Sequence, residues 1–222
     1  MGKKMKRLQS VLKDERSGKV LFVSHCILNT NARYLGGAFR GCCVKEILDE
    51  AVNREIALVQ MPCPEQKAWG GILKSYMWLA FEGRKNGTLR LLKLVFPLFM
   101  AYTRFIFRRT ARSVVKEIID YENAGYEVTG ILGIDGSPTC GVLKAINMKR
   151  AFDFYASCSL ESLNRAEFNE KLYGLCLGDM SGIYISELKR LLKKNGREIN
   201  FYSHSLIDEM NGKKTKMQEE KA

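Results

Sequence analysis

Four short, mainly apolar runs recur along the chain and are separated by more polar segments. They cover residues 19–24, 54–61, 126–134 and 197–203. Continuous apolar runs of this length are typical of strands in a parallel sheet that is covered on both faces. The pattern therefore predicts four strands of one buried sheet.

Amphipathic segments with helical periodicity lie between these runs, at 42–53, 111–125 and 181–196. The last two end on Gly125 and Gly196, and glycine commonly follows the last turn of a helix. Regular alternation of strand and helix favours right-handed βαβ crossovers. We therefore expect an α/β fold, a three-layer sandwich with a mostly parallel central sheet.

Residues 89–108 break this regularity because they are strongly apolar yet carry a narrow basic stripe. The longest stretch without charge, 94–103, is far shorter than the roughly 20 residues that a membrane span needs. We expect Pro97 to kink or divide the helix, and interpret about 78–110 as a helical insertion. Packing on the core or in a dimer is favoured, ahead of contact with lipid and, last, with nucleic acid.

Charge and length complete the outline. The 222 residues carry a formal net charge of +12, and residues 84–112 hold eight Lys or Arg and no Asp or Glu. Residues 1–17 and 207–222 are charged and are expected to be tails, which leaves a single domain over 18–206. No apolar run follows the basic N-terminal residues, so we expect a cytoplasmic protein with reduced thiols.

Three of the seven cysteines share one setting. Cys26, Cys63 and Cys140 each follow a predicted strand, and three of the four prolines lie within two residues of them. The ends of parallel strands meet at one edge of a sheet, where ligands bind. Three soft thiolates at that edge favour an iron–sulfur cluster over zinc. The remaining cysteines are interpreted as packing residues: Cys42, Cys43, Cys158 and Cys176.

The cysteine segments CILNTNARYLGG, PCPEQKAWGG and GIDGSPTCGV resemble the signature segments of the thiouracil desulfurase family, and the likeness runs from Lys19 to His204. The resemblance implies a [4Fe–4S] cluster held by Cys26, Cys63 and Cys140 only. One iron is then left open to take sulfur from a thiolated nucleobase.

The same resemblance implies that Glu65 is the acid–base carboxylate and that Ser137 is a polar group near the substrate. This chain departs from the family at Leu35, where an Asp is usual, and after Glu65, where Pro-Arg is customary. These departures leave the cluster ligands intact and the substrate open.

Three further residues near the first cysteine are candidates for substrate contact. His25 precedes a predicted ligand, Tyr34 can stack on a ring, and Arg33 can bind a carbonyl or a phosphate. Together with Glu65, which can take a proton from water and return one to the leaving ring, they suit the attack of water on a thiocarbonyl carbon.

The function expected first is an iron–sulfur-dependent desulfurase acting on a small thiolated, nucleobase-like compound. A second hypothesis is a non-catalytic iron–sulfur binding or sensing module, which docks a membrane surface or a partner protein through residues 84–112. A third is a metal-free thiol enzyme with Cys63 or Cys140 as the nucleophile. Nucleic acid is the least favoured partner.

Overall fold

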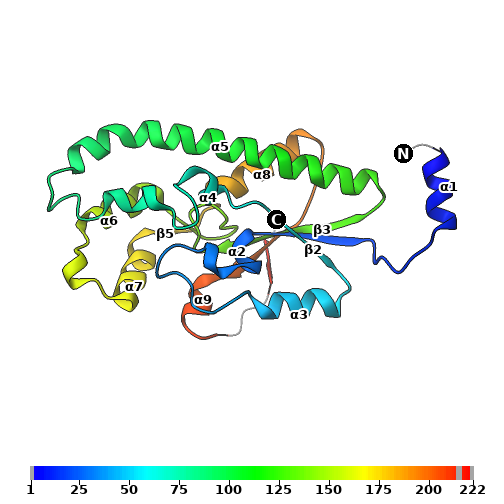
Figure 1. The fold of residues 1–222 in the computed structure, drawn as a ribbon, viewed down its shortest axis with the longest axis horizontal. Helices are drawn as coiled ribbons and strands as arrows, with labels where there is room; N and C mark the ends of the chain where they lie inside the picture. The colour runs from blue at the N-terminus through cyan, green and yellow to red at the C-terminus, as the bar shows by residue number, and fades with distance from the viewer. Residues whose placement is uncertain (1–2, 214–216, 221–222) are drawn as a thin grey trace.

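The computed structural model describes residues 3–213 and 217–220 and contains one central sheet with helices on both faces (Figure 1). Its strands lie in the order β2-β1-β3-β6-β7. The first four are parallel neighbours, and β7 pairs antiparallel with β6. They span β1 (Lys19–Val23), β2 (Ala57–Gln60), β3 (Glu127–Asp135), β6 (Phe201–Ser205) and β7 (Gln218–Glu219). The expected α/β class and mostly parallel sheet are confirmed.

The helices form the outer layers of the sandwich. In Figure 1, α5 and α8 cover one face of the sheet, and α3 and α9 lie on the other. In chain order the helices are α1 (Lys3–Val11), α2 (His25–Leu28), α3 (Lys45–Asn53), α4 (Pro64–Ala68), α5 (Leu89–Asn123), α6 (Met148–Ser157), α7 (Arg165–Cys176), α8 (Ile183–Lys194) and α9 (Leu206–Met210). Short 3-10 turns are η1 (Thr30–Ala32), η2 (Ser75–Ala80) and η3 (Leu160–Ser162).

The main core lies between the sheet and the layer formed by α5 and α8. Phe22 of β1 and Ile131 of β3 are fully buried, and Val114, Ile118 and Leu188 of the two helices pack in the same apolar cluster. The predicted runs are strands because both of their faces find apolar cover, which is the condition that a parallel sheet requires.

Helix α5 differs from the expected insertion. It runs unbroken for 35 residues, so the crossover helix that leads into β3 and the basic apolar segment are one element. The expectation that Pro97 divides the helix is wrong. Pro97 is exposed, so water can reach the carbonyl that loses its amide partner to the proline ring. Among the described residues, no helix is long and apolar enough to cross a membrane.

A smaller lobe, which the hydrophobic pattern left unassigned, packs beside the sandwich. It contains α6, α7 and an antiparallel pair of two-residue strands, β4 (Ala145–Ile146) and β5 (Leu177–Gly178). Its own apolar cluster includes Tyr155, Phe168 and Leu172. The lobe lies near the end of the sheet where the cysteine loops emerge, so it can form a wall of the site (Figure 1).

The two expected tails are partly structured. Residues 3–11 form α1, whose described side chains are all exposed. The C-terminal stretch is not simply a charged tail, because it contains most of α9 and adds β7 to the sheet edge. Glu209 of α9 has only 5% exposure and pairs with Arg33, so this part of the chain belongs to the domain.

Candidate functional site

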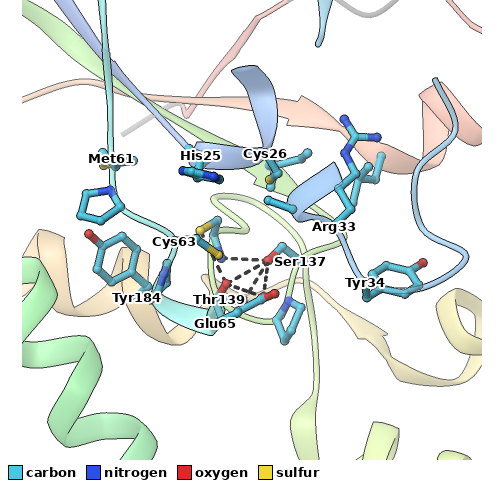
Figure 2. Close-up of a pocket in the computed structure, with 18 residues that line it drawn as sticks. His25, Cys26, Arg33, Tyr34, Met61, Cys63, Glu65, Ser137, Thr139 and Tyr184 are labelled. Atoms are coloured by element: carbon cyan, nitrogen blue, oxygen red, sulfur yellow. Dashed lines mark hydrogen bonds between the residues drawn. The ribbon is translucent and has the colours of Figure 1, made fainter. Parts of the chain in front are cut away.

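The three predicted cysteine ligands meet in one pocket at the carboxyl edge of the sheet (Figure 2). Cys26 lies on α2 after β1, Cys63 precedes α4 after β2, and Cys140 lies in the loop after β3. Parallel pairing directs these three strand ends to the same edge. The pocket has a volume of about 40 Å³.

All eight residues that the sequence singled out line this pocket. The structure thus brings together the predicted ligands, the carboxylate, the serine and the three candidate substrate contacts. They are His25, Cys26, Arg33, Tyr34, Cys63, Glu65, Ser137 and Cys140. Leu35 does not line it and is 51% exposed.

Local sequence explains how Cys63 and Glu65 are held. Cys63 is the N-cap of α4, and its sulfur accepts the Gln66 amide at 3.4 Å. Pro64 occupies the first helical turn, where its missing N–H costs nothing. Glu65 follows in the same turn and is 9% exposed. The short helix therefore orients the thiol and the carboxylate together.

The Cys140 loop is ordered by two side chains. Ser137 Oγ accepts the amides of Thr139 and Cys140 at 3.2 and 3.1 Å. Asp135 Oδ1 accepts three successive amides beyond the cysteine, at 2.8, 3.0 and 3.2 Å. Gly136 has a φ of 91°, which glycine adopts without strain. The S-P-T-C-G segment is thus a tight turn that presents its thiol inward.

Glu65 is the centre of a hydrogen-bonded group. Thr139 Oγ1 donates to Glu65 Oε1 at 2.7 Å, and Ser137 Oγ donates to the same oxygen at 3.3 Å. The Lys74 ammonium lies 3.6 Å from Oε2, and its side chain is 2% exposed. Lys74 also donates to the Ala32 carbonyl. This places a buried positive charge beside the carboxylate.

Burial dominates the electrostatics of the thiols. It raises the pKa of Cys26, and the neighbouring Arg33 charge partly opposes that shift. Burial and then the Glu65 carboxylate raise the pKa of Cys63 to about 12. The pKa of Cys140 is raised well above its usual range by burial, followed by Cys26 and Glu65. As free thiols the three are therefore protonated near neutral pH.

Two candidate substrate contacts are already engaged within the protein. Arg33 donates both terminal nitrogens to Glu209, while its buried Nε has no hydrogen-bond partner among the described residues. Tyr34 donates its hydroxyl to Asn169 at 2.6 Å. Their guanidinium and ring form a rigid wall. Burial, followed by Lys74, lowers the pKa of His25, which favours a neutral imidazole.

A second chamber lies on the other side of Glu65. It shares Tyr34, Glu65 and Pro138 with the thiol pocket and is lined further by aromatic side chains that include Trp69 and Trp78. Its volume is about 30 Å³. A planar ring entering it would have to push these side chains apart, and would then lie with one edge at the carboxylate and one face on an aromatic wall.

Several polar groups of the site were missed by sequence reasoning. Lys74 and Thr139 contact Glu65, and Ser24 and Tyr184 line the thiol pocket with buried hydroxyl oxygens that have no partner in the described part of the chain. Thr139 lies within a motif that was recognised, so it could have been found. Ser24 lies two residues before the predicted ligand Cys26, so it too had a local signal. Lys74 and Tyr184 reach the site through tertiary packing, which leaves no local signal.

The donor set suits an iron–sulfur cluster bound through three thiolates. Three soft sulfurs border one cavity with the hydroxyls of Ser24 and Tyr184, which have no partner among the described residues, and a cluster would offer sulfur acceptors to those hydroxyls. Among the described residues no group of three or more His, Cys, Asp or Glu is spaced to hold a single metal ion. That spacing does not argue against a cubane, in which each thiolate binds its own iron.

The other four cysteines do not line the thiol pocket. Cys176 is fully buried in the core of the small lobe, as expected, and Cys158 borders a separate surface hollow. The interpretation of Cys42 as a packing residue is wrong, because Cys42 is exposed and precedes α3 rather than lying on its buried face.

Comparisons with protein-family models, curated proteins and solved structures found no match for this chain.

Proposed function

We propose that this protein is an iron–sulfur-dependent desulfurase that removes sulfur from a small thiolated compound, and that it works in the cytoplasm, where thiols stay reduced. The observation that carries the proposal is the pocket in which Cys26, Cys63 and Cys140 lie together with Glu65 and with no other cysteine. The resemblance of the three cysteine segments to the thiouracil desulfurase family supports the same reaction.

The proposed reaction converts a thiocarbonyl and water into a carbonyl and hydrogen sulfide. A three-cysteine [4Fe–4S] cluster, when bound by Cys26, Cys63 and Cys140, supplies an iron with an open position that can bind and polarise the sulfur. The carbon–sulfur bond breaks as a water oxygen bonds to the carbon. The water must lose its protons in this step, so a base is needed beside the thiocarbonyl carbon.

Glu65 is the group placed to act as that base. Its Oε1 is held by the hydroxyls of Thr139 and Ser137, and Oε2 faces Lys74. The carboxylate takes a proton from the attacking water and returns one to the leaving group. Lys74 and the two hydroxyls act as positioning groups, since together they contact both oxygens of the carboxylate. The aromatic lining of the chamber beyond Glu65 offers stacking faces to a nucleobase-like ring that pushes these side chains apart.

The raised thiol pKa values count against the alternative of a metal-free thiol enzyme. A nucleophilic cysteine needs a lowered pKa, which a nearby cation or a helix N-terminus provides. Here burial raises the pKa of all three thiols.

The test is sulfide release from a thiolated pyrimidine by anaerobically reconstituted protein. We expect turnover in the wild type and a loss of about 10²-fold or more in Glu65→Gln, with iron content unchanged, because general-base catalysis contributes that much. Glu167→Gln, an exposed carboxylate on α7, is the matched control. Equal iron but no sulfide release from any thiolated base tested would contradict the proposal.

A second candidate is a cluster-bearing sensing module without turnover. The observation in its favour is that both oxygens of Glu65 already have partners within the protein, as in a purely structural carboxylate. Under this alternative, Glu65→Gln would leave the biological activity unchanged.

A further inference from the structure

The outer face of α5 carries a row of exposed apolar side chains. Six large apolar residues between positions 91 and 105 have exposures from 42% to 75%. They are Leu91, Leu94, Val95, Leu98, Tyr102 and Phe105. Most are spaced three or four residues apart, which places them on one side of the helix. We call this row the α5 stripe. A contiguous apolar row, unlike a scattered residue, marks a surface that meets another phase or molecule.

The apolar surface continues beside the stripe. A hollow of about 310 Å³ lies between α5, η2 and α6, and all of its lining residues are apolar or aromatic. Leu79 and Tyr76 of η2 border it, and both are more than half exposed. Val95 belongs to both the hollow and the stripe. The unpartnered surface is therefore wider than one helix face.

Positive charge borders this apolar surface. Residues 84–112 contain eight Lys or Arg and no Asp or Glu. Four arginines line a surface hollow with Phe105 at the end of the stripe: Arg104, Arg108, Arg109 and Arg112. Within the described part of the chain, Arg104 and Arg109 have no ion-pair partner. The surface thus combines apolar tips with uncompensated positive charge.

This combination selects the occupant. A second copy of the chain would bring its own basic residues against these, and like charges repel. A nucleic acid matches the charge but not the exposed leucines. Apart from the Tyr102 hydroxyl, the stripe offers no directional hydrogen bond, so it suits a fluid surface better than a folded partner. We propose that α5 lies flat in the interface of an anionic lipid bilayer, with the stripe at the acyl boundary and the arginines at the phosphates.

Vesicle co-sedimentation of the full-length protein tests this proposal. The probes are vesicles of neutral phosphatidylcholine and vesicles in which about a third of the lipid is phosphatidylserine. We expect binding to the anionic vesicles, at least tenfold weaker binding to the neutral ones, and marked loss of binding at about 0.5 M salt. Leu94→Gln combined with Leu98→Gln should weaken binding more than tenfold, because two apolar side chains no longer leave water.

Matched controls distinguish binding through this surface from nonspecific binding to lipid. Leu175→Gln removes a leucine of 60% exposure on α7 and should leave binding unchanged. Arg104→Gln with Arg109→Gln should weaken binding at low salt, whereas Lys193→Gln with Lys194→Gln on α8 should not. Absence of binding to anionic vesicles overturns the proposal. A dimer in light scattering that becomes monomeric in Leu94→Gln/Leu98→Gln also overturns it. So does a protein that binds only a single-stranded oligonucleotide, with an affinity that those two substitutions leave unchanged.

Discussion

The buried ion pair between Arg33 and Glu209 gives the sharpest stability prediction. Glu209 is replaced by Gln, which keeps the volume of the side chain and removes its charge. Both side chains are almost fully inaccessible, at 2% and 1%. Arg33 donates two hydrogen bonds to the carboxylate, and His204 Nε2 lies 2.7 Å from Oε2. The substitution leaves the guanidinium buried without its counter-charge, which costs about 3–5 kcal/mol of the free energy of unfolding.

The same site predicts how that cost depends on pH. Burial alone would raise the pKa of Glu209, but the hydrogen bonds from His204 and Arg33 lower it to about 2. A carboxyl with a depressed folded pKa stabilises the fold above its unfolded pKa of about 4.5, and this contribution fades as pH falls toward 2. The difference of about 2.5 pKa units corresponds to about 3 kcal/mol. The difference in free energy of unfolding between wild type and Glu209→Gln should therefore decrease by up to that amount as the pH falls from 5 to 2.

The assay is urea unfolding followed by tryptophan fluorescence at several pH values. Glu167→Gln is the matched control. Glu167 pairs with Lys171 on the surface, with both side chains more than half exposed, so its loss should cost about 0.5 kcal/mol or less. A loss of less than about 1 kcal/mol in the free energy of unfolding of Glu209→Gln would refute this reasoning. A difference in unfolding free energy from wild type that stays constant with pH would also refute it.

Three further predictions follow from the site and the core. Thr139→Val removes the 2.7 Å hydrogen bond to Glu65 and should lower the turnover number for sulfide release while leaving the iron content unchanged. The control Thr129→Val removes a hydroxyl on β3 and should leave the turnover number unchanged. Phe107→Ala empties a fully buried position between Trp69 and Tyr184 and should cost about 3–5 kcal/mol in urea unfolding; a cost near that of an exposed residue would contradict the packing described. Tyr184→Phe removes a buried hydroxyl without a partner among the described residues, so it should not destabilise the metal-free protein. It should shift the reduction potential of the reconstituted protein. An unchanged potential would show that the Tyr184 hydroxyl does not contact the cluster.

The sheet and the cysteine loops were predictable because their signals are local. Each strand is a short apolar run, and parallel pairing then brings Cys26, Cys63 and Cys140 to one edge without further information. Glu65 follows for the same reason, since it lies two residues after a predicted ligand. The residues around Cys140 reveal a turn through Ser137 and Gly136.

The features that the sequence did not predict depend on long-range contacts. Pro97 argued locally for a break in α5, yet the helix continues because the packing of its C-terminal half against α8 and the sheet decides its course. The small lobe escaped notice because α7 buries Asn169 and exposes Leu175, which blurs its amphipathic pattern. Lys74 and Glu209 meet the site only through tertiary contacts. Nothing adjacent to either residue in the sequence marks it as part of a pocket.

Iron and sulfide analysis of anaerobically reconstituted protein and its cysteine variants tests the three-cysteine cluster most directly. Wild-type protein should bind about four irons per chain. The cluster should be lost in Cys26→Ser, Cys63→Ser or Cys140→Ser, whereas Cys158→Ser and Cys42→Ser should keep full iron content. A colourless protein that retains stoichiometric zinc, or loss of iron in Cys158→Ser, would contradict a three-cysteine cluster with one open iron.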